Sequence, residues 1–292
     1  VCARASDSVQ NIADDPMIDF AIVTTPPNAR RQIVEILAAA GKPILMEKPV
    51  ERSLEAAEGL VELCEELDVP LGIVLQHRAR PAATTLRAKM AELGPLIAVE
   101  VAVPWWRPQS YYDEPGRGSY SRDGGGVLIS QAIHTLDLML SLTGPIAEVT
   151  AMCATTAFHS MEAEDFVTAG LAFANGAVGT LFASTASFPG TGETITLHCQ
   201  NGTARLAAGM LRVDKSDGTS EEIGEAAGSG AGADPMAFTS DWHQTVIEDF
   251  AAAITTSRPP LVPGREALKV HALIAAIEEA GRHGQRVSVR PT

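Results

Sequence analysis

Two short segments of the sequence carry side chains that could move a proton or hold a developing charge. Lys48 directly follows a short apolar run, and His134 follows the glycine-rich run Asp123–Gly126. A neutral imidazole can accept or return a proton near neutral pH, whereas an ammonium group can donate a hydrogen bond to an alkoxide-like oxygen. Taken singly, a lysine at a strand end is often only solvated, and a lone histidine is often structural.

The segment that contains His134 has the periodicity of a helix. Its apolar residues recur at the spacing of one helix face, at Ile129, Ala132, Ile133, Leu136 and Leu140. Ser130, His134 and Asp137 form a polar line on a different face, and the preceding glycines allow another group to approach the start of the helix. We therefore expect His134 to act on a bound molecule, with Ser130 as a neighbouring substrate contact.

Aromatic residues gather in one stretch, since five of the six Trp and Tyr residues fall within residues 105–120. Aromatic faces stack on the apolar faces of sugar-like rings, and arginine can bind a carboxylate through two hydrogen bonds. Trp106, Arg107 and Tyr112 are therefore candidate substrate contacts. His243, at the start of a later helix, is a further candidate. The same aromatic residues would equally suit a contact between subunits.

The elements that must position these residues alternate between strand and helix over the first 76 residues. In chain order, strands and helices are expected at residues 19–25, 29–40, 43–46, 53–67 and 71–75, with Ser53 as the N-cap of the second helix. Strands that alternate with helices at this spacing form a parallel, doubly wound sheet. Ligands of such sheets bind outside the carboxyl ends of the strands, where Glu47, Lys48 and Pro49 fall.

The second half of the chain has a different pattern, in which strands follow one another without intervening helices. Strands are expected at residues 97–103, 148–154, 166–173, 177–185, 194–199 and 211–215, and helices at 82–93, 128–142, 241–256 and 265–283. Asn175-Gly176, Asn201-Gly202 and Asp217-Gly218 are signals for tight hairpin turns. The pattern predicts a mainly antiparallel sheet flanked by helices, with residues 225–235 as a Gly/Ala-rich loop.

Composition excludes several classes of protein. Of the 292 residues 46% are hydrophobic, which is enough for a packed core, and the formal net charge of −14 offers no basic surface for nucleic acid. No apolar run approaches the roughly 20 residues that span a bilayer, so no membrane contact is expected. The four scattered cysteines favour a reducing, cytoplasmic compartment. No group of residues has the spacing of metal ligands, and no metal site is expected.

Together these segments resemble the glucose–fructose oxidoreductase/inositol dehydrogenase/MocA (Gfo/Idh/MocA) family. The resemblance rests on Thr25-Pro26-Pro27-Asn28, on the segment from Gly41-Lys42-Pro43 to Glu47-Lys48-Pro49, on the glycine-rich run before His134 and Asp137, and on Glu164-Asp165 and Asn175-Gly176-Ala177. These matches occur in the family's order over nearly the whole chain, which makes them more specific than either motif alone.

The resemblance implies an α/β plus α+β fold. Residues 1–76 would form a partial dinucleotide-binding Rossmann domain, and residues 77–292 a substrate-binding and oligomerisation domain. The cofactor would be NAD or NADP, with contacts from Thr24, Thr25, Pro26, Pro27, Asn28, Glu47, Lys48 and Pro49. Lys48 and His134 would be the catalytic residues, and the Lys48–Pro49 bond would be cis. A homo-oligomer, a dimer or a tetramer, is also implied.

The sequence departs from the family's pattern at three places. The opening strand and its GxGxxG turn, which holds the pyrophosphate, are absent. Either the chain is an N-terminally shortened form or the protein has lost the usual cofactor site. Because the sequence begins with Val1, we expect the first, with roughly 50–70 further N-terminal residues in the intact gene product, the size of the first βα units. Ser130 stands where the family often has Asp or Asn, and Arg30 where a histidine is frequent.

The leading interpretation is an NAD(P)-dependent oxidoreductase that transfers a hydride to or from a hydroxyl or carbonyl group of a sugar, polyol or related small molecule. One alternative is a non-catalytic regulatory protein of the same fold that binds a dinucleotide or a sugar. Another is a redox-assisted, NAD-dependent glycosidase. Ser130 and the absent glycine-rich turn favour the regulatory protein, whereas Lys48 and His134 favour an enzyme.

Overall fold

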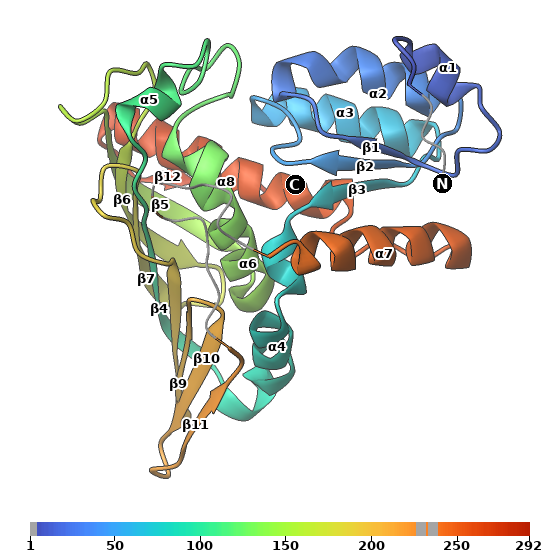
Figure 1. Cartoon of the computed structure of the whole chain (residues 1–292). Helices are drawn as coiled ribbons and strands as arrows, with labels where there is room; N and C mark the ends of the chain where they lie inside the picture. The colour runs from blue at the N-terminus through green and yellow to red at the C-terminus, as the bar shows by residue number, and fades with distance from the viewer. Residues whose placement is uncertain (1–4, 226–231, 233–238) are drawn as a thin grey trace.

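The chain begins with a small parallel sheet. The computed structural model describes residues 5–225, 232 and 239–292 (Figure 1). Strands β1 (Ala21–Val23), β2 (Ile44–Glu47) and β3 (Leu71–Val74) lie side by side in that order, and both pairings are parallel. All of β3 and all but the last residue of β2 are buried, as expected of strands covered on both faces.

Helices cover both faces of this sheet. On one side lie α2 (Arg30–Ala39) and α3 (Leu54–Glu66), with the short α1 (Val9–Ala13) packed on α2 (Figure 1). The Ser53 side chain accepts a hydrogen bond from the backbone N–H of Ala56 at 3.2 Å, which confirms the predicted N-cap of α3. The other face is covered by α7, described below.

The connection to the second half runs through a short 3₁₀ segment, η2 (Gln76–Ala79), which follows β3 directly. Helix α4 (Pro81–Leu93) comes next and leads into β4 (Leu96–Pro104). A comparable 3₁₀ turn, η1 (Pro27–Ala29), lies between β1 and α2. A short 3₁₀ segment therefore follows the carboxyl ends of β1 and β3.

The second sheet has nine strands, in the order β11-β10-β9-β8-β4-β7-β6-β5-β12. Only β4 and β7 pair in parallel; the other neighbours are antiparallel. The bounds of the strands after β4 are β5 (Ile146–Ala154), β6 (Phe166–Phe173), β7 (Val178–Ser184), β8 (Thr194–Cys199), β9 (Gly202–Ala207), β10 (Met210–Lys215), β11 (Ser220–Ile223) and β12 (Val287–Ser288). The three predicted hairpin turns join β6 to β7, β8 to β9 and β10 to β11.

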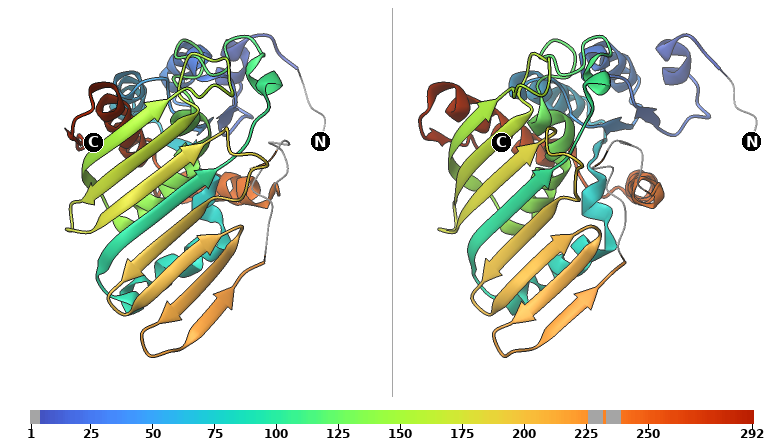
Figure 2. Two further views of the ribbon diagram at one scale, coloured as in Figure 1. Left: turned by 90° about the vertical axis from the view of Figure 1, so that its left-hand side faces the viewer. Right: turned by 60° about the vertical axis from the view of Figure 1, so that its left-hand side comes forward.

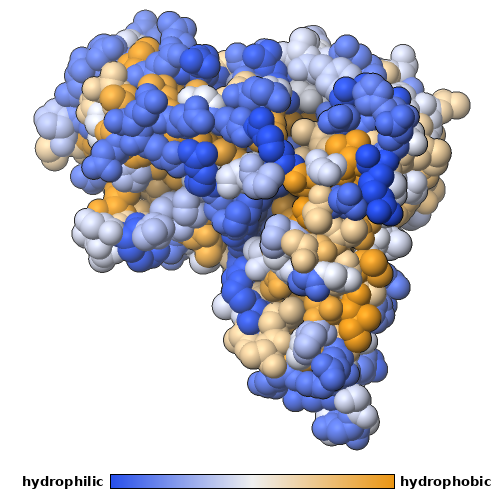
Figure 3. Space-filling view, turned by 180° about the vertical axis from the view of Figure 1, so that it is seen from behind, coloured by the Kyte–Doolittle hydropathy of each residue, from blue (hydrophilic) through white to orange (hydrophobic). Residues whose placement is uncertain are grey.

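Helices cover only one face of this sheet, and the opposite face is open (Figure 2). The covering helices include α6 (Ile133–Thr143), which continues a π-helical turn, η3 (Leu128–Ala132), and α8 (Gly264–His283). A short helix, α5 (Gln109–Tyr112), lies in the loop after β4. In the view from behind, hydrophobic atoms lie among hydrophilic ones on the part that carries this sheet (Figure 3).

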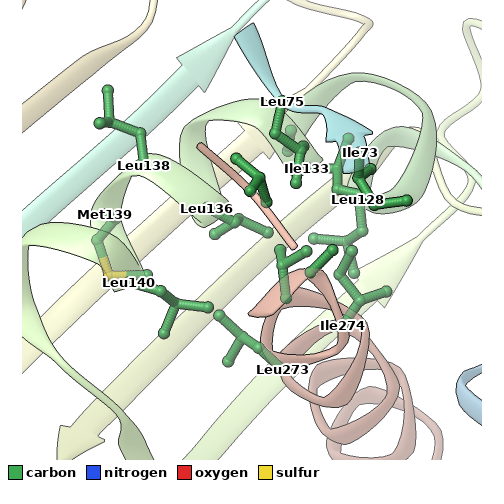
Figure 4. Close-up of a cluster of buried hydrophobic side chains, with 14 of the residues drawn as sticks. Ile73, Leu75, Leu128, Ile133, Leu136, Leu138, Met139, Leu140, Leu273 and Ile274 are labelled. Carbon is green, nitrogen blue, oxygen red and sulfur yellow. The ribbon is translucent and has the colours of Figure 1, made fainter. Parts of the chain in front are cut away.

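The main core joins the two sheets. Apolar side chains from the end of β3, from η3 and α6, and from α8 converge there, among them Leu75, Leu136 and Leu273 (Figure 4). A smaller cluster holds α7 (Asp241–Thr256) against the first sheet through Phe250, which is fully buried. Among the described residues, no helix is both long enough and apolar enough to cross a membrane.

The predicted elements are confirmed, with some differences. The strands β9 and β11 were not predicted, and the expected helix at 128–142 begins as a π-helical turn. Helices α7 and α8 follow residue 76 in sequence but also contact β3, and the boundary at residue 76 stays a prediction. Most of the expected loop at 225–235, together with Cys2, falls outside the described residues.

Candidate active site

A cavity of about 320 Å³ opens between the first sheet and the helices of the second half. Lys48 reaches it from the end of β2, His134 from α6, and Arg107 from the loop after β4. Trp242 and His243, in the first turn of α7, line another side. Residues predicted from distant parts of the sequence therefore meet in one place.

Lys48 is held at the base of this cavity by its backbone and its side chain. The Lys48–Pro49 peptide bond is cis, as expected. The Nζ atom donates a hydrogen bond to the backbone oxygen of Ser130 at 2.6 Å. Loss of solvent lowers the pKa of the Lys48 ammonium to about 8, although the nearby Glu47 carboxylate opposes this shift. The side chain therefore remains a cation at neutral pH.

Arg30 fixes the backbone around Lys48. It is 2% exposed, and its Nε donates to the backbone oxygen of Thr25 at 2.9 Å. Its Nη1 donates to the backbone oxygens of Glu47 and Pro49. One guanidinium thus ties the turn after β1 to the turn after β2. The resemblance predicts a histidine at this position. The arginine found there shapes the site through its hydrogen bonds to the backbone.

His134 faces the cavity with one ring nitrogen unoccupied. The residue is 7% exposed, and its Nδ1 has no hydrogen-bond partner. Burial lowers the pKa of the imidazole well below its usual value, and the positive charges of Lys48 and Arg80 lower it further. His134 is therefore neutral at pH 7 and can accept a proton.

Asp137, the third residue of the polar line, does not contact His134. Its carboxylate accepts two hydrogen bonds from Arg78, at 2.6 and 2.7 Å, and the pair is buried. This bidentate pair joins α6 to the η2 turn. Asp137 therefore positions the helix that carries His134 and is not among the groups that shift the pKa of its imidazole.

A second buried arginine builds the opposite wall. Arg80 pairs with Glu193 at 2.5 Å, and its guanidinium lies 4.4 Å from the centre of the Trp242 ring. It also donates to Nε2 of His77, so the proton of this imidazole lies on Nδ1. The His77 and His134 rings lie 5.0 Å apart. The charges of Arg80 and Glu193 on this side of the cavity therefore neutralise each other.

Several buried polar atoms around the cavity have no partner in the described structure. They belong to cavity-lining residues and are Gln76 Oε1, His77 Nδ1, Arg80 Nε, Arg107 Nε, Gln131 Oε1 and His134 Nδ1. Buried polar groups are normally hydrogen-bonded, because an unmade bond costs free energy. A ligand with several hydroxyl or carbonyl oxygens would satisfy these atoms.

Two predicted substrate contacts, Trp106 and Tyr112, do not line the cavity. The Tyr112 ring is buried, and its hydroxyl hydrogen-bonds to the Thr185 hydroxyl at 2.8 Å. The Trp106 ring packs on Phe188. β4 ends at Pro104, so beyond it the alternation of a strand no longer indicates which neighbouring aromatic residue points inward. The cavity is lined instead by their chain neighbours, Trp105 and Tyr111.

The η2 turn also contributes side chains to the cavity that were not expected from the sequence. Gln76, His77 and Arg80 all line the cavity, and none was singled out. The sequence did contain a signal for their role in a binding site, since these polar residues come soon after the buried strand β3. They occupy the carboxyl end of a parallel strand, where ligands are expected.

The turns after β1 and β2 hold the residues that the resemblance predicts as contacts with a dinucleotide. Of these residues, Glu47 and Lys48 line the cavity. Those that do not line it are Pro49, after β2, and Thr24, Thr25, Pro26, Pro27 and Asn28, after β1. The Thr25 hydroxyl is buried without a partner, which suits a donor or acceptor for a bound ribose or amide. In the described ranges, no glycine-rich turn follows any strand of the first sheet.

Two family models match the chain. Residues 2–74 match the model described as "Oxidoreductase family, NAD-binding Rossmann fold", and residues 85–205 match "GFO/IDH/MocA C-terminal domain". The two matches follow each other along the chain, and residues 75–84, which include η2 and the start of α4, lie between them. Both the fold expected from the resemblance and its dinucleotide-binding character are confirmed.

Individual relatives have similar sequences and folds. A D-apiose dehydrogenase of Rhizobium rhizogenes is 26% identical over 98% of this chain and 83% of its own length. An uncharacterized Saccharomyces cerevisiae protein is also 26% identical, but the match spans 70% of this chain and only 59% of that protein. The WlbA dehydrogenase from Bordetella pertussis, solved with NADH and UDP-GlcNAcA, superposes with a TM-score of 0.80 at 28% identity over 97% of this chain and 83% of that one.

Proposed function

Because the chain belongs to the Gfo/Idh/MocA family of oxidoreductases, we propose that it transfers a hydride between NAD or NADP and a sugar, polyol or related small molecule. The observation that carries this proposal is the meeting of a buried neutral imidazole, His134, and a buried ammonium, Lys48, in one cavity. The relatives named as dehydrogenases support it.

The two side chains divide the work of oxidising a secondary alcohol. When bound, the nicotinamide accepts the hydride that leaves carbon. Lys48 donates a hydrogen bond to the hydroxyl oxygen and stabilises the negative charge that develops there. His134 accepts the hydroxyl proton on a free ring nitrogen. In the reverse direction His134 returns this proton to the carbonyl oxygen.

Other residues bind and orient the reactants. Arg30 holds the turns after β1 and β2, which supply the contacts with the cofactor. Ser130, Arg107 and His243 line the cavity beside His134 and are in place to bind the substrate. These assignments follow from the placement of the side chains around the cavity.

The direct test measures formation of reduced nicotinamide by the full chain with a panel of sugars, polyols and sugar acids, with NAD and with NADP. Turnover of any member of the panel that disappears in the His134→Asn variant supports the proposal. Binding of the dinucleotide without turnover across the panel would contradict hydride transfer and indicate a ligand-binding role.

We further propose that the protein is a homo-oligomer, a dimer or a tetramer, formed through the open face of the nine-stranded sheet. Met152 on β5 is 56% exposed there, and no helix covers this face (Figure 2). A sheet covered on one side must pack or polarise the other. The strands β5, β6 and β7 place Ala, Met, Phe and Thr side chains on it, with few charges.

A cytoplasmic location is part of the same proposal. Cys64, Cys153 and Cys199 are free thiols in the described structure. Proteins of oxidising compartments more often pair their cysteines.

A further inference from the structure

Within the described residues, no carboxylate oxygen lies within 4.0 Å of the buried guanidinium of Arg107, which lines the cavity. Resting on the hydride-transfer function proposed above, we propose that the substrate is a sugar acid and that Arg107 binds its carboxylate. The proposal gives the substrate a carboxylate and names Arg107 as the residue that binds it. Neither the family match nor the activity by itself specifies such a group.

The surroundings of Arg107 leave part of its guanidinium free. The residue is 2% exposed, and its Nη1 donates to the backbone oxygens of Trp106 and Gly232 at 2.8 and 2.7 Å. Its Nε is buried without a partner. The guanidinium carbon lies 5.3 Å from the centre of the Trp105 ring, another wall of the cavity. The guanidinium also interacts with the Tyr111 side chain, and both residues line the cavity.

The other buried arginines of this region have carboxylate partners. Arg78 makes a bidentate pair with Asp137, and Arg80 pairs with Glu193. Within the described ranges no Asp or Glu oxygen lies within 4.0 Å of Arg107. Burial lowers the pKa of Arg107, because the protein supplies too little negative charge to offset the loss of solvent. A bound anion would provide the missing partner.

The backbone that carries Arg107 is held in place from two sides. Its N–H donates to the oxygen of Thr185 at 2.8 Å, and its carbonyl oxygen lies 2.8 Å from Nε2 of His159. The other nitrogen of that ring lies 2.7 Å from Asp165, and the His159 and Asp165 side chains are fully buried. Arg107 is therefore presented by a rigid support, as a binding group should be.

The remaining features of the cavity favour a sugar acid over a phosphate ester. Two arginines line the cavity. Glu193 neutralises Arg80, whereas Arg107 has no carboxylate partner within the described ranges, and the Lys48 ammonium is the other cation of the cavity. The free polar atoms of Gln76 and Gln131 suit hydroxyl groups, and the Trp105 ring offers a flat apolar face. The volume of about 320 Å³ lies at the small end of ligand sites, roughly 300–1,000 Å³.

The test compares acids with neutral sugars of the same shape, using the full chain with NAD. D-glucuronate, D-galacturonate and D-gluconate are measured against D-glucuronamide, D-galactose and D-glucose, with glucose 6-phosphate as a phosphate probe. Binding is followed by calorimetry and turnover by formation of reduced nicotinamide. The variants are Arg107→Gln and, as a matched loss of one positive charge, Arg212→Gln on the exposed face of β10.

We expect at least one acid to bind more tightly than its neutral counterpart. Arg107→Gln should weaken binding of that acid roughly 30- to 1,000-fold, as expected for loss of one member of a buried charge pair, and should weaken binding of the neutral sugars much less, so that the ratio of acid to neutral affinity falls. Arg212→Gln should change neither. The ratio of acid to neutral affinity within one preparation does not depend on how much of a variant is folded.

The outcomes separate this inference from the proposed function. Oxidation of neutral sugars with no preference for any acid would overturn the inference and leave hydride transfer intact. Binding of an acid that Arg107→Gln abolishes, without turnover, would support the inference and contradict the function. A preference for glucose 6-phosphate over every carboxylate, or an acid preference that survives in Arg107→Gln, would also overturn it.

Discussion

Lys48 Nζ donates a hydrogen bond to the backbone oxygen of Ser130 at 2.6 Å. These residues lie 82 positions apart in the sequence, one beside the cis peptide after β2 and the other in the π-helical turn that leads into α6. The bond fixes the ammonium group one helical turn before His134. The positive charge of Lys48 therefore adds to the effect of burial in lowering the pKa of the His134 imidazole.

The first prediction concerns His134. The His134→Asn variant keeps a polar side chain but cannot accept the hydroxyl proton, so kcat should fall roughly 10²- to 10⁴-fold. Thermal unfolding should change little, because no hydrogen bond of the folded state uses Nδ1. The same substitution at His283, at the exposed end of α8, is the matched control. Full activity in His134→Asn would remove this residue from the proton-transfer step.

The second prediction concerns pH. The pKa of Lys48 is lowered to about 8 by burial, so its positive charge is present below pH 8 and is lost as the pH rises through this value. The pH profile of kcat/KM for alcohol oxidation should therefore show a basic limb near pH 8. Lys48→Arg retains its charge at higher pH, so the limb should move upward, with lower kcat if the longer side chain misplaces the substrate. A basic limb that is identical in both proteins would belong to another group.

Much of the fold could be predicted because it depends on local signals. The strands of the first sheet are buried on both faces and therefore appear as uninterrupted apolar runs, and Ser53 is a local N-cap. Asn175-Gly176 supplies its hairpin through its own backbone conformation. The strand β9 was missed because its sequence, GTARLA, mixes polar and small residues and gains its burial only from its neighbours.

The site was only partly predictable because its contacts are long-range. Lys48 and His134 stood out by residue type and by motif, and they do meet. Arg78 and Asp137 pair although they lie 59 residues apart, and no local sequence pattern indicates such a pair. The same holds for Arg30, whose partners Glu47 and Pro49 are known only once β1 and β2 lie side by side.

The third prediction concerns Arg30. Arg30→Met should lower the free energy of unfolding by about 2–4 kcal/mol, because several buried carbonyl oxygens lose a charged donor. It should also raise the Kd for the dinucleotide, since the turns after β1 and β2 lose their common anchor. Urea unfolding and calorimetry measure the two effects.

The neighbouring residue supplies the control for this experiment. Arg31→Met removes a guanidinium that is exposed and paired only with Glu35, one turn along α2. It should leave stability and cofactor affinity unchanged. Equal effects of the two substitutions would show that Arg30 has no special role in the site.

The fourth prediction concerns the open sheet face. Met152→Glu places a charge on this face, on β5, so the oligomer should dissociate to monomers in light scattering at micromolar concentration. Met17→Glu introduces the same charge at a residue that is 80% exposed in a turn before β1, and it should leave the assembly intact. A monomeric wild-type protein, or an oligomer that survives Met152→Glu, would contradict the proposed interface.

The last prediction uses Ser130 to alter both catalytic groups together. Ser130→Asp adds a carboxylate one helical turn before His134 and next to the Nζ of Lys48. A nearby negative charge favours the protonated form of both groups, so the pKa of each should rise. The acidic limb of the kcat/KM profile, where His134 must lose its proton, and the basic limb, where Lys48 must keep its own, should both move to higher pH. Ser130→Asn has nearly the same shape without the charge and should move neither limb. An active Ser130→Asp variant with unshifted limbs would show that the observed titrations belong to groups other than His134 and Lys48.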